Sequence, residues 1–212
     1  MGGRDPDGPA SLGEASTNEL ALALRERLFA DETTVVWPLE VFNLVRTIAV
    51  MPCVDAFPVR WRGRSSPEIG FILRNTGRFK GKRWCIGGRL NIGESFGHSL
   101  TRHVREALGV GFSLAPGLSW HHPAYVGQYA PSAIPLLEGE NLGSEPSKYC
   151  PSNTYLIELA SEDFKFGSTA HGGQEAGDFR WFPLSHLPYD NLAYGGEHTV
   201  RACAEWVRTN LP

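Results

Sequence analysis

The chain has 212 residues and a formal net charge of −3, with 42% apolar and 20% charged residues. This is the composition of an ordinary globular domain that can bury a full hydrophobic core. The slight acidic excess disfavours wholesale binding to nucleic acid or to an anionic membrane surface, since both require a strong basic excess.

The four cysteines, at positions 53, 85, 150 and 203, form no C-x-x-C pair. The spacing supports neither a zinc site nor a thioredoxin-like motif, so the cysteines are interpreted as reduced packing residues of a cytoplasmic protein. No apolar run approaches the roughly 18 residues that a membrane-spanning helix needs, and no membrane contact is expected.

The N-terminal part of the chain predicts two segments outside the main domain. Residues 1–15 are polar and rich in Gly and Pro, and are interpreted as a disordered leader. Ser16 and Glu19 have the spacing of a capping box, and leucines then recur every fourth residue. Residues 16–37 are therefore expected to form a helical arm.

From residue 38 onward, strand and helix patterns mix without a regular βαβ rhythm, which predicts an α+β domain with a mixed sheet over residues 38–212. Strands are expected at 48–61, 69–73, 84–86, 119–129, 152–160 and 179–182, and helices at 95–108 and 196–210. The segment from about residue 130 to residue 152 is rich in Pro, Gly, Ser and Glu. This composition predicts a long loop that acts as a mobile lid or a partner-facing insertion.

A basic, Gly-punctuated loop (NTGRFKGK, residues 75–82) lies between the second and third expected strands. Its Arg78 and Lys80, together with Arg74, could hold phosphate groups. A solvated surface loop explains the same charges equally well, because Lys and Arg side chains mostly face water.

The stretch that is most informative about function is residues 88–110, GRLNIGESFGHSLTRHVREALGV. On a helical wheel, an apolar side that can pack on a sheet opposes a charged side. The apolar side carries Phe96, Leu100, Val104 and Leu108, and the charged side carries His98, Arg102, Arg105 and Glu106. Such a charged side is usually a solvated surface. Here, however, Gly87 and Gly88 precede it and would let the backbone approach a ligand closely.

This stretch resembles the signature of Nudix hydrolases, G-x5-E-x7-R-E-U-x-E-E-x-G-U, in which U is an aliphatic residue. The positions that match at the required spacing are Gly88, Glu94, Arg102, Val104, Glu106, Gly109 and Val110. His103 replaces the first helix Glu, and Ala107 replaces the last one. The resemblance implies an α/β/α sandwich with a mixed central sheet.

The resemblance also implies a diphosphate hydrolase that depends on Mg²⁺, or alternatively on Mn²⁺. A bound Mg²⁺ would offset the charge of the diphosphate and orient the attacking water. Carried over by position, Glu106 and the Gly88 carbonyl are the metal ligands. The Arg102–Glu94 pair holds the loop against the helix. A single remaining helix carboxylate points to one metal ion rather than two or three.

A weaker resemblance concerns the GDP-mannose mannosyl hydrolases, a branch of this family. The segment from Arg46 to Asp55 is similar to the N-terminal segment of that branch, and Arg89 matches it as well. This implies a nucleotide sugar of the GDP-mannose type as substrate. Arg46 and Arg89 would contact phosphate or base, and Asp55 would contact the base. Arg74 and Tyr155 complete the expected substrate-binding residues.

Glu175 and the following residues 179–184 resemble the late Nudix stretch E-x5-W-F-P-L. Glu175 is therefore expected to take the proton from the attacking water, with His103 as the alternative. The expected partners are a small-molecule diphosphate and a second copy of the chain in a homodimer. Two other functions stay open: a binding protein that kept the fold and lost catalysis, and a hydrolase of a non-nucleotide organic diphosphate.

Overall fold

The computed structural model describes residues 50–63, 66–130, 142–144, 149–167, 174 and 176–211. The expected leader, the helical arm and most of the expected loop at 130–152 lie outside these residues. So do two of the expected site residues, Arg46 and Glu175.

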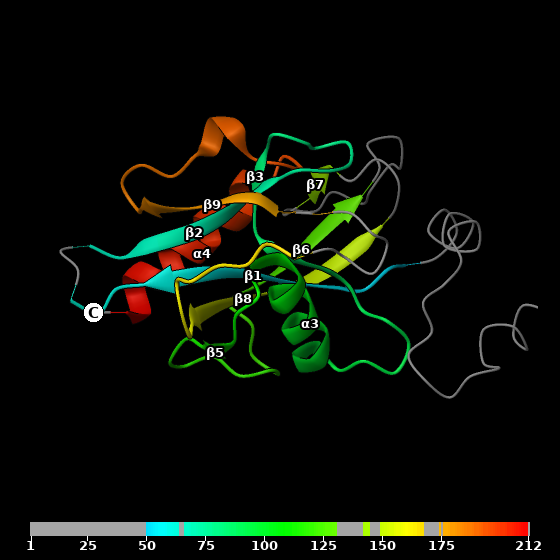
Figure 1. The fold of residues 1–212 in the computed structure, drawn as a ribbon, viewed down its shortest axis with the longest axis horizontal. Helices are drawn as coiled ribbons and strands as arrows, with labels where there is room; N and C mark the ends of the chain where they lie inside the picture. The colour runs from blue at the N-terminus through cyan, green and yellow to red at the C-terminus, as the bar shows by residue number, and fades with distance from the viewer. Residues whose placement is uncertain are drawn as a thin grey trace, which may run out of the picture.

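The described residues form a mixed sheet of nine strands and two α-helices (Figure 1). The strands are β1 (Cys53–Arg60), β2 (Glu68–Arg74), β3 (Arg83–Trp84), β4 (Ile86–Arg89), β5 (Phe112–Leu114), β6 (Tyr125–Ala130), β7 (Leu142–Ser144), β8 (Cys150–Leu159) and β9 (Ala176–Pro183). The helices are α3 (Phe96–Leu108) and α4 (Glu197–Asn210), and a short 3-10 helix, η1, spans Tyr189–Asn191.

The main path of the sheet runs β3-β2-β1-β8-β6-β7, while β4 pairs with β1, β5 with β8 and β9 with β2. The central pair β1 and β8 is parallel, and β1 is antiparallel to both β2 and β4. The predicted mixed sheet of an α+β domain is therefore confirmed.

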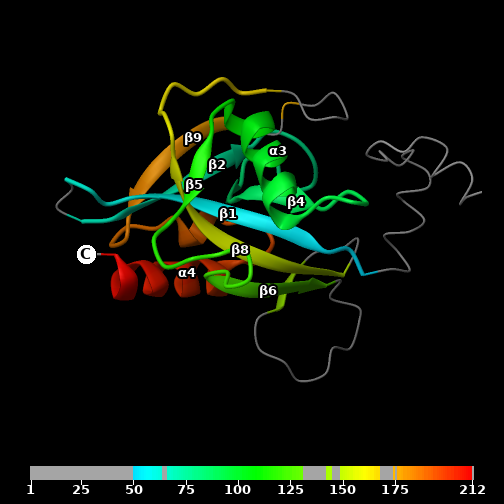
Figure 2. The ribbon, with the colours of Figure 1, turned by 90° about the horizontal axis from the view of Figure 1, so that it is seen from below.

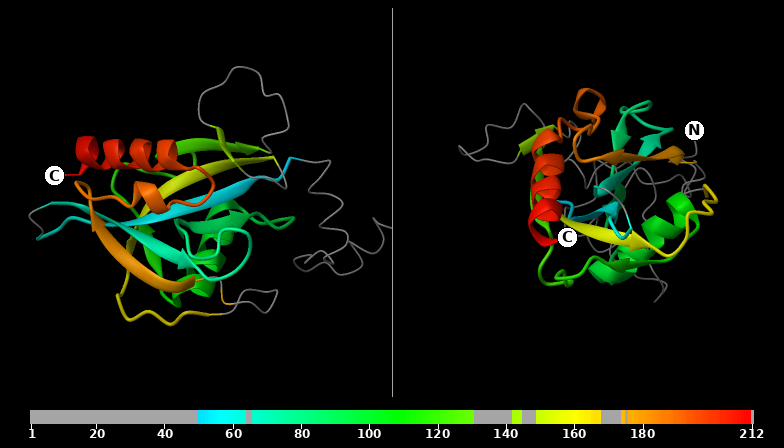
Figure 3. Two further views of the ribbon diagram at one scale, coloured as in Figure 1. Left: turned by 90° about the horizontal axis from the view of Figure 1, so that it is seen from above. Right: turned by 90° about the vertical axis from the view of Figure 1, so that its left-hand side faces the viewer.

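The two helices cover opposite faces of the sheet (Figures 2 and 3). The cause is the two-residue period of β1, because successive side chains of a strand point to opposite faces. Cys53, Phe57 and Val59 join the core cluster under α4, whereas Val54 and Ala56 join the cluster under α3. This arrangement is the predicted α/β/α sandwich.

Helix α3 begins and ends where its capping residues predict. The Ser95 side chain accepts a hydrogen bond from the backbone N–H of His98 at 3.2 Å. Gly109 adopts the left-handed conformation (φ 71°) and donates its N–H to the Arg105 carbonyl. Leu100 and Val104 are fully buried against the sheet, which leaves the charged side of the helix facing outward.

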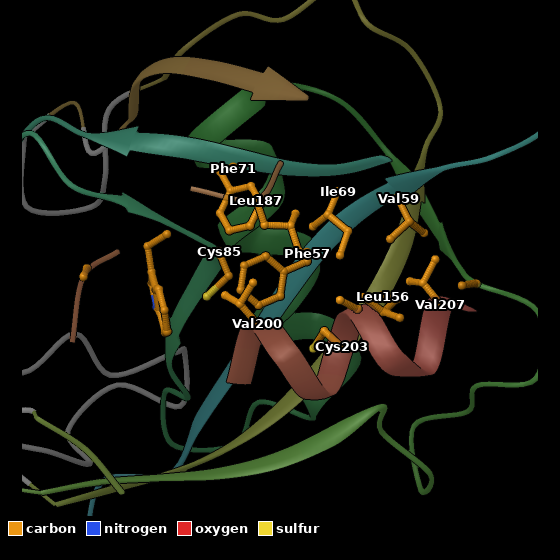
Figure 4. Packing of buried hydrophobic residues seen from close by; sticks show 14 of the residues in the cluster. Phe57, Val59, Ile69, Phe71, Cys85, Leu156, Leu187, Val200, Cys203 and Val207 are labelled. Carbon is orange, nitrogen blue, oxygen red and sulfur yellow. The ribbon is translucent and has the colours of Figure 1, made fainter. Parts of the chain in front are cut away.

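Helix α4 closes the other face of the sheet. Val200, Cys203 and Val207 point inward as predicted, and they pack near Phe57 and Leu156 (Figure 4). All four cysteines are free and buried, which confirms their packing role. Within the described ranges, no helix is long and apolar enough to cross a membrane.

Two strands start later than predicted because of proline, and two short strands have no predicted counterpart. Strand β1 starts at Cys53, directly after Pro52, and β6 starts at Tyr125, two residues after Pro123. Proline has no N–H to donate to a strand neighbour, so both expected strands lose their first residues. The short strands β5 and β7 were not predicted, and β7 lies inside the expected loop.

Candidate active site

The outward side of α3 carries a closely bonded ion pair between Arg102 and Glu94. The Nε and Nη2 atoms of Arg102 each donate to one oxygen of Glu94 at 2.7 Å. The backbone N–H of Asn91 donates to the same carboxylate at 2.8 Å. The Arg102 guanidinium, helped by the Asn91 N–H, lowers the pKa of Glu94 to about 2. The predicted pair is thus present and holds the loop against the helix.

Arg102 also reaches the end of β4. Its Nη2 atom donates to the Arg89 carbonyl at 3.2 Å and to the Ser99 hydroxyl at 3.3 Å. The Ser99 hydroxyl donates to that same carbonyl. Burial, followed by the Arg102 charge, lowers the pKa of Arg89. The residues around Gly88 are therefore tied to α3 at several points.

His103 is nearly buried, with 11% of its side chain exposed. Its Nε2 atom lies 3.1 Å from the Arg89 carbonyl. Because a carbonyl can only accept, Nε2 carries the proton and donates. Burial and the neighbouring Arg102 charge lower the pKa of His103 to about 4. A Cβ at position 88 would lie 2.9 Å from His103 Cε1, so the close approach of this ring favours Gly88.

Glu106 is the carboxylate that remains at the helix surface. Its Oε2 atom lies 3.7 Å from Arg102 Nη1 and 3.9 Å from His103 Nδ1, and 21% of its side chain is exposed. Ala107, at the position of the missing last Glu, is 4% exposed and packs in the core under α3. This part of the helix therefore offers one accessible carboxylate.

Among the residues that the structure describes, no group of three or more His, Cys, Asp or Glu side chains could hold a metal ion. The hard oxygen donors that remain are the Glu106 carboxylate and the Gly88 carbonyl. Mg²⁺ commonly keeps several waters and takes only one or two carboxylates together with substrate phosphates. The donor set therefore fits a Mg²⁺ ion held jointly with a bound diphosphate, but not a preformed multi-carboxylate centre.

A cavity of about 150 Å³ lies at the end of the sheet where β1 and β8 begin. Its lining residues come from six strands and from the segment before α4. They are Cys53, Asp55, Arg74, Trp84, Gly87, Gly88, Tyr129, Cys150, Ser152 and Tyr194. Cys53 and Tyr129 belong to the core cluster under α4, so the cavity opens on the face opposite α3.

Asp55 is a buried carboxylate on the cavity wall, with 9% exposure. The Ser152 hydroxyl donates to its Oδ2 atom at 2.6 Å. The Cys85 thiol also bonds it, and burial together with the Asp55 charge raises the pKa of Cys85. A Cβ at position 87 would collide with Asp55 Oδ1, so Gly87 makes room for the carboxylate. These donors offset the cost of burying a charge.

Three aromatic rings form another wall of the cavity. The ring centroids of Trp84, Tyr129 and Tyr194 lie 5.4 to 6.2 Å apart. The Tyr129 and Thr199 hydroxyls are hydrogen-bonded at 2.6 Å, which fixes the Tyr129 ring to α4. The Arg74 guanidinium lies 5.5 Å from the Tyr194 ring centroid. The cavity thus combines flat apolar surfaces with one carboxylate and one guanidinium.

Tyr194 has a left-handed backbone (φ 59°), and it is the one non-glycine residue with positive φ in the described ranges. This conformation is costly for a residue with a Cβ, and such strain concentrates at functional sites. Tyr194 and Ser152 were both missed by the sequence analysis. The Tyr-Gly-Gly run before α4 was the available signal for Tyr194.

The structure separates the predicted substrate-binding residues into three groups. Asp55 and Arg74 line the cavity together with Gly88, whereas Arg89 is tied to α3 through its backbone carbonyl, which accepts from Arg102. Tyr155 is fully buried in the core under α3, and its hydroxyl donates to the Trp120 carbonyl at 2.8 Å. Tyr155 therefore lies on the face of the sheet opposite the cavity, because β8 turns Ser152 and Tyr155 to opposite faces. Arg46 lies outside the described residues.

No protein-family model and no curated protein matches the chain. Solved structures do match it, at low sequence identity. A possible asymmetric diadenosine tetraphosphate hydrolase from Jonesia denitrificans has 20% identity and a TM-score of 0.57, and the match covers 78% of this chain and 98% of that chain. A MutT/nudix family protein from Enterococcus faecalis has 15% identity and a TM-score of 0.54, with 92% and 75% covered.

A UDP-X diphosphatase has 15% identity and a TM-score of 0.51, with 91% of this chain and 80% of that chain covered. At this level of identity the comparison establishes the architecture only. The chain has the Nudix fold, as the signature-like stretch predicted.

Proposed function

We propose that the chain is a Mg²⁺-dependent hydrolase, with Mn²⁺ as an alternative ion, of a nucleoside diphosphate linked to a second moiety. The observation that carries this proposal is the position of Gly88. It lines the cavity on one face of the sheet, and it lies against His103 of α3 on the other. A ligand in the cavity would bring its phosphates past Gly88 toward Glu106.

The cavity suits the base of a nucleotide. Flat rings stack on aromatic side chains such as Trp84 and Tyr194. The Asp55 carboxylate accepts hydrogen bonds only, so it favours a base that presents N–H donors on one edge. Guanine presents two neighbouring donors of this kind. A nucleotide sugar of the GDP-mannose type is therefore the first substrate to test.

The residues around Gly88 would have different roles at the phosphates. The Glu106 carboxylate and the Gly88 carbonyl would hold Mg²⁺, while the Glu94–Arg102 pair keeps the loop in place. When bound, Mg²⁺ offsets charge on the phosphates and orients the attacking water. Glu175 would accept the proton of that water. His103 is the poorer candidate, because its ring is nearly buried and its Nε2 atom is engaged with the Arg89 carbonyl at 3.1 Å.

The names of two solved structures with this fold agree with a phosphate-linked substrate. One is described as a possible asymmetric diadenosine tetraphosphate hydrolase and the other as a UDP-X diphosphatase. The active form would be a homodimer that acts on a small-molecule diphosphate.

A second candidate is a binding protein that kept the Nudix fold and lost catalysis. Ala107 favours it, because this helix position faces the core and supplies no carboxylate. A third candidate keeps hydrolysis but takes a non-nucleotide organic diphosphate, which would leave Asp55 without a base to bind.

One screen separates the three candidates. Purified protein is incubated with nucleotide sugars including GDP-mannose, dinucleoside polyphosphates and non-nucleotide diphosphates, with Mg²⁺, with Mn²⁺ or with a chelator. Binding is measured in parallel by calorimetry. Metal-dependent turnover of a nucleotide derivative is expected. Binding without turnover would favour the binding protein, and turnover of non-nucleotide compounds alone would favour the third candidate.

A further inference from the structure

The basic loop between β2 and β3, residues 75–82, starts and ends beside the cavity. Arg74, which precedes the loop, and Trp84, two residues after it, both line the cavity. The loop closes on itself, because Arg74 N–H donates to the Lys82 carbonyl at 2.9 Å and Gly81 N–H donates to the Arg74 carbonyl at 2.8 Å.

Further contacts hold this loop in one position. The Phe79 ring packs on Tyr194, with centroids 4.2 Å apart, and Tyr194 is itself part of the cavity wall. The Asn191 side chain donates to the Gly81 carbonyl at 3.4 Å. The loop is therefore a hairpin anchored beside the cavity, so its backbone loses little freedom when the loop binds a ligand.

The loop is strongly basic in a chain whose formal net charge is −3. Residues 74–83 contain five Arg or Lys and no Asp or Glu. Arg78 and Lys80 are exposed, and neither makes an ion pair with any residue that the structure describes. This is unlike the neighbouring Arg83, which pairs with Asp178 at 2.8 Å.

The nearby acidic side chain is already occupied. Asp178 accepts from Arg83 and also from Arg180, at 2.8 and 2.9 Å. The two guanidinium groups lower the pKa of Asp178, although burial acts the other way. Among the described residues, no acidic side chain thus neutralises Arg78 or Lys80, and their charge can serve a ligand.

We propose that the loop 75–82 is a phosphate subsite, in which Arg78 and Lys80 bind a phosphate group beyond the diphosphate that is cleaved. Resting on the proposed function, this adds nucleotide derivatives with at least three phosphates to the substrates to test beside GDP-mannose, whose uncharged sugar would not bind these two cations. Arg and Lys are the side chains that bind phosphate oxygens most strongly.

Calorimetry with inorganic tripolyphosphate, in low salt and without metal, tests the subsite directly. The double variant Arg78→Gln/Lys80→Gln removes two charges of the loop. The control Arg62→Gln/Arg208→Gln removes two charges elsewhere, since Arg62 follows the far end of β1 and Arg208 lies in the last turn of α4. Both control side chains are well exposed, and ion pairs of such side chains contribute little to stability.

Wild type and the control variant are expected to bind tripolyphosphate with the same affinity. The loop variant is expected to bind it about tenfold more weakly, because it loses two charge-assisted contacts at a solvated site. Three results would overturn the proposal: no binding to wild type, wild-type affinity in the loop variant, or equal weakening in both variants. Because calorimetry needs no turnover, a lack of hydrolysis would count against the proposed function alone.

Discussion

Arg102 and Glu94 form a two-point ion pair that joins helix α3 to the loop before it, with both hydrogen bonds at 2.7 Å. The Glu94 side chain is 12% exposed and that of Arg102 is 25% exposed. Such forked pairing fixes the angle between the two groups as well as their distance. The pair therefore sets where the loop that follows Gly88 meets the helix.

Replacing Glu94 by Gln is expected to cost stability at neutral pH and to change the response to acid. The folded-state pKa of about 2 lies below the ordinary 4.5, so the contribution is full above pH 4.5 and is lost as the pH falls toward 2. The loss at pH 7 should be about 1–2 kcal/mol, since water still reaches the pair. Urea unfolding between pH 7 and pH 3 measures it.

The matched control for this variant is Glu205→Gln, which breaks an exposed pair with Arg208 on α4. It should change the free energy of unfolding by much less, and its dependence on pH should stay like that of wild type. Equal losses of unfolding free energy in the two variants would show that the Glu94–Arg102 pair stabilises the fold no more than an exposed ion pair does.

Glu106→Gln is expected to lower metal-dependent turnover by about a hundredfold or more, because the substitution removes the one carboxylate proposed to hold Mg²⁺. The fold should be unaffected, since the Glu106 side chain is 21% exposed and lies 3.7 and 3.9 Å from Arg102 Nη1 and His103 Nδ1, which are loose contacts. The measurements are kcat against Mg²⁺ concentration and the thermal melting temperature. Near-normal turnover would remove Glu106 from the mechanism, and Glu205→Gln again serves as the control.

The sequence predicted those parts of the fold that local signals determine. The predicted bounds of the helix, 95–108, agree closely with those of α3, Phe96–Leu108, because Ser and Gly are residue types that commonly cap helices and stand here at positions 95 and 109. The starts of β1 and β6 were placed too early, although Pro52 and Pro123 were visible. The short strand β7 exists only through its pairing with β6, and its own residues, Leu-Gly-Ser, carry no strand signal.

Contacts of the candidate site between residues that are close in sequence could be predicted, whereas contacts between distant residues could not. Glu94 and Arg102 are eight residues apart, and the signature spacing was enough to pair them. Asp55 and Ser152 are 97 residues apart and meet only because β1 and β8 are parallel neighbours. No short-range pattern contains that information. The face on which Tyr155 lies could not be predicted for the same reason, since the face of a strand residue depends on the register of the sheet.

Asp55→Asn tests whether the cavity recognises a base. The wild type is expected to bind GMP more tightly than AMP, because the carboxylate can accept from two neighbouring donors of guanine. The Asn side chain can still accept from Ser152 but presents an N–H toward the base, so the preference for GMP should fall by about tenfold. Calorimetry with both nucleotides measures the ratio.

A suitable control for that variant is Asp163→Asn, which removes one exposed carboxylate elsewhere. It should leave both affinities as in wild type. Asp55→Asn should not unfold the chain, because it removes a buried charge and keeps the shape. If wild type fails to prefer GMP, or if the preference survives in Asp55→Asn, the assignment of Asp55 to base recognition is wrong.

Glu175 and His103 are the two candidates for the group that takes the proton from water. The pKa of His103 is lowered from 6.5 to about 4 by burial and by Arg102, so its ring is neutral at every pH above that value. A rise in kcat centred near pH 6.5 would thus not report on His103. An ordinary Glu titrates near 4.3, so both candidates place the rising limb in the acid range.

Substitution therefore separates the two groups where a wild-type pH profile cannot. Glu175→Gln is expected to lower kcat by about a hundredfold to ten-thousandfold, the usual loss for a missing general base, and to abolish the acid limb. His103→Gln should cost less than about tenfold, because a Gln amide can still donate to the Arg89 carbonyl and keep the end of β4 in place. The measurement is kcat between pH 3.5 and pH 9 for both variants. The assignment would be reversed if His103→Gln lost most of its kcat while Glu175→Gln kept a near-normal kcat and the acid limb. The buried imidazole of His103 would then be the base.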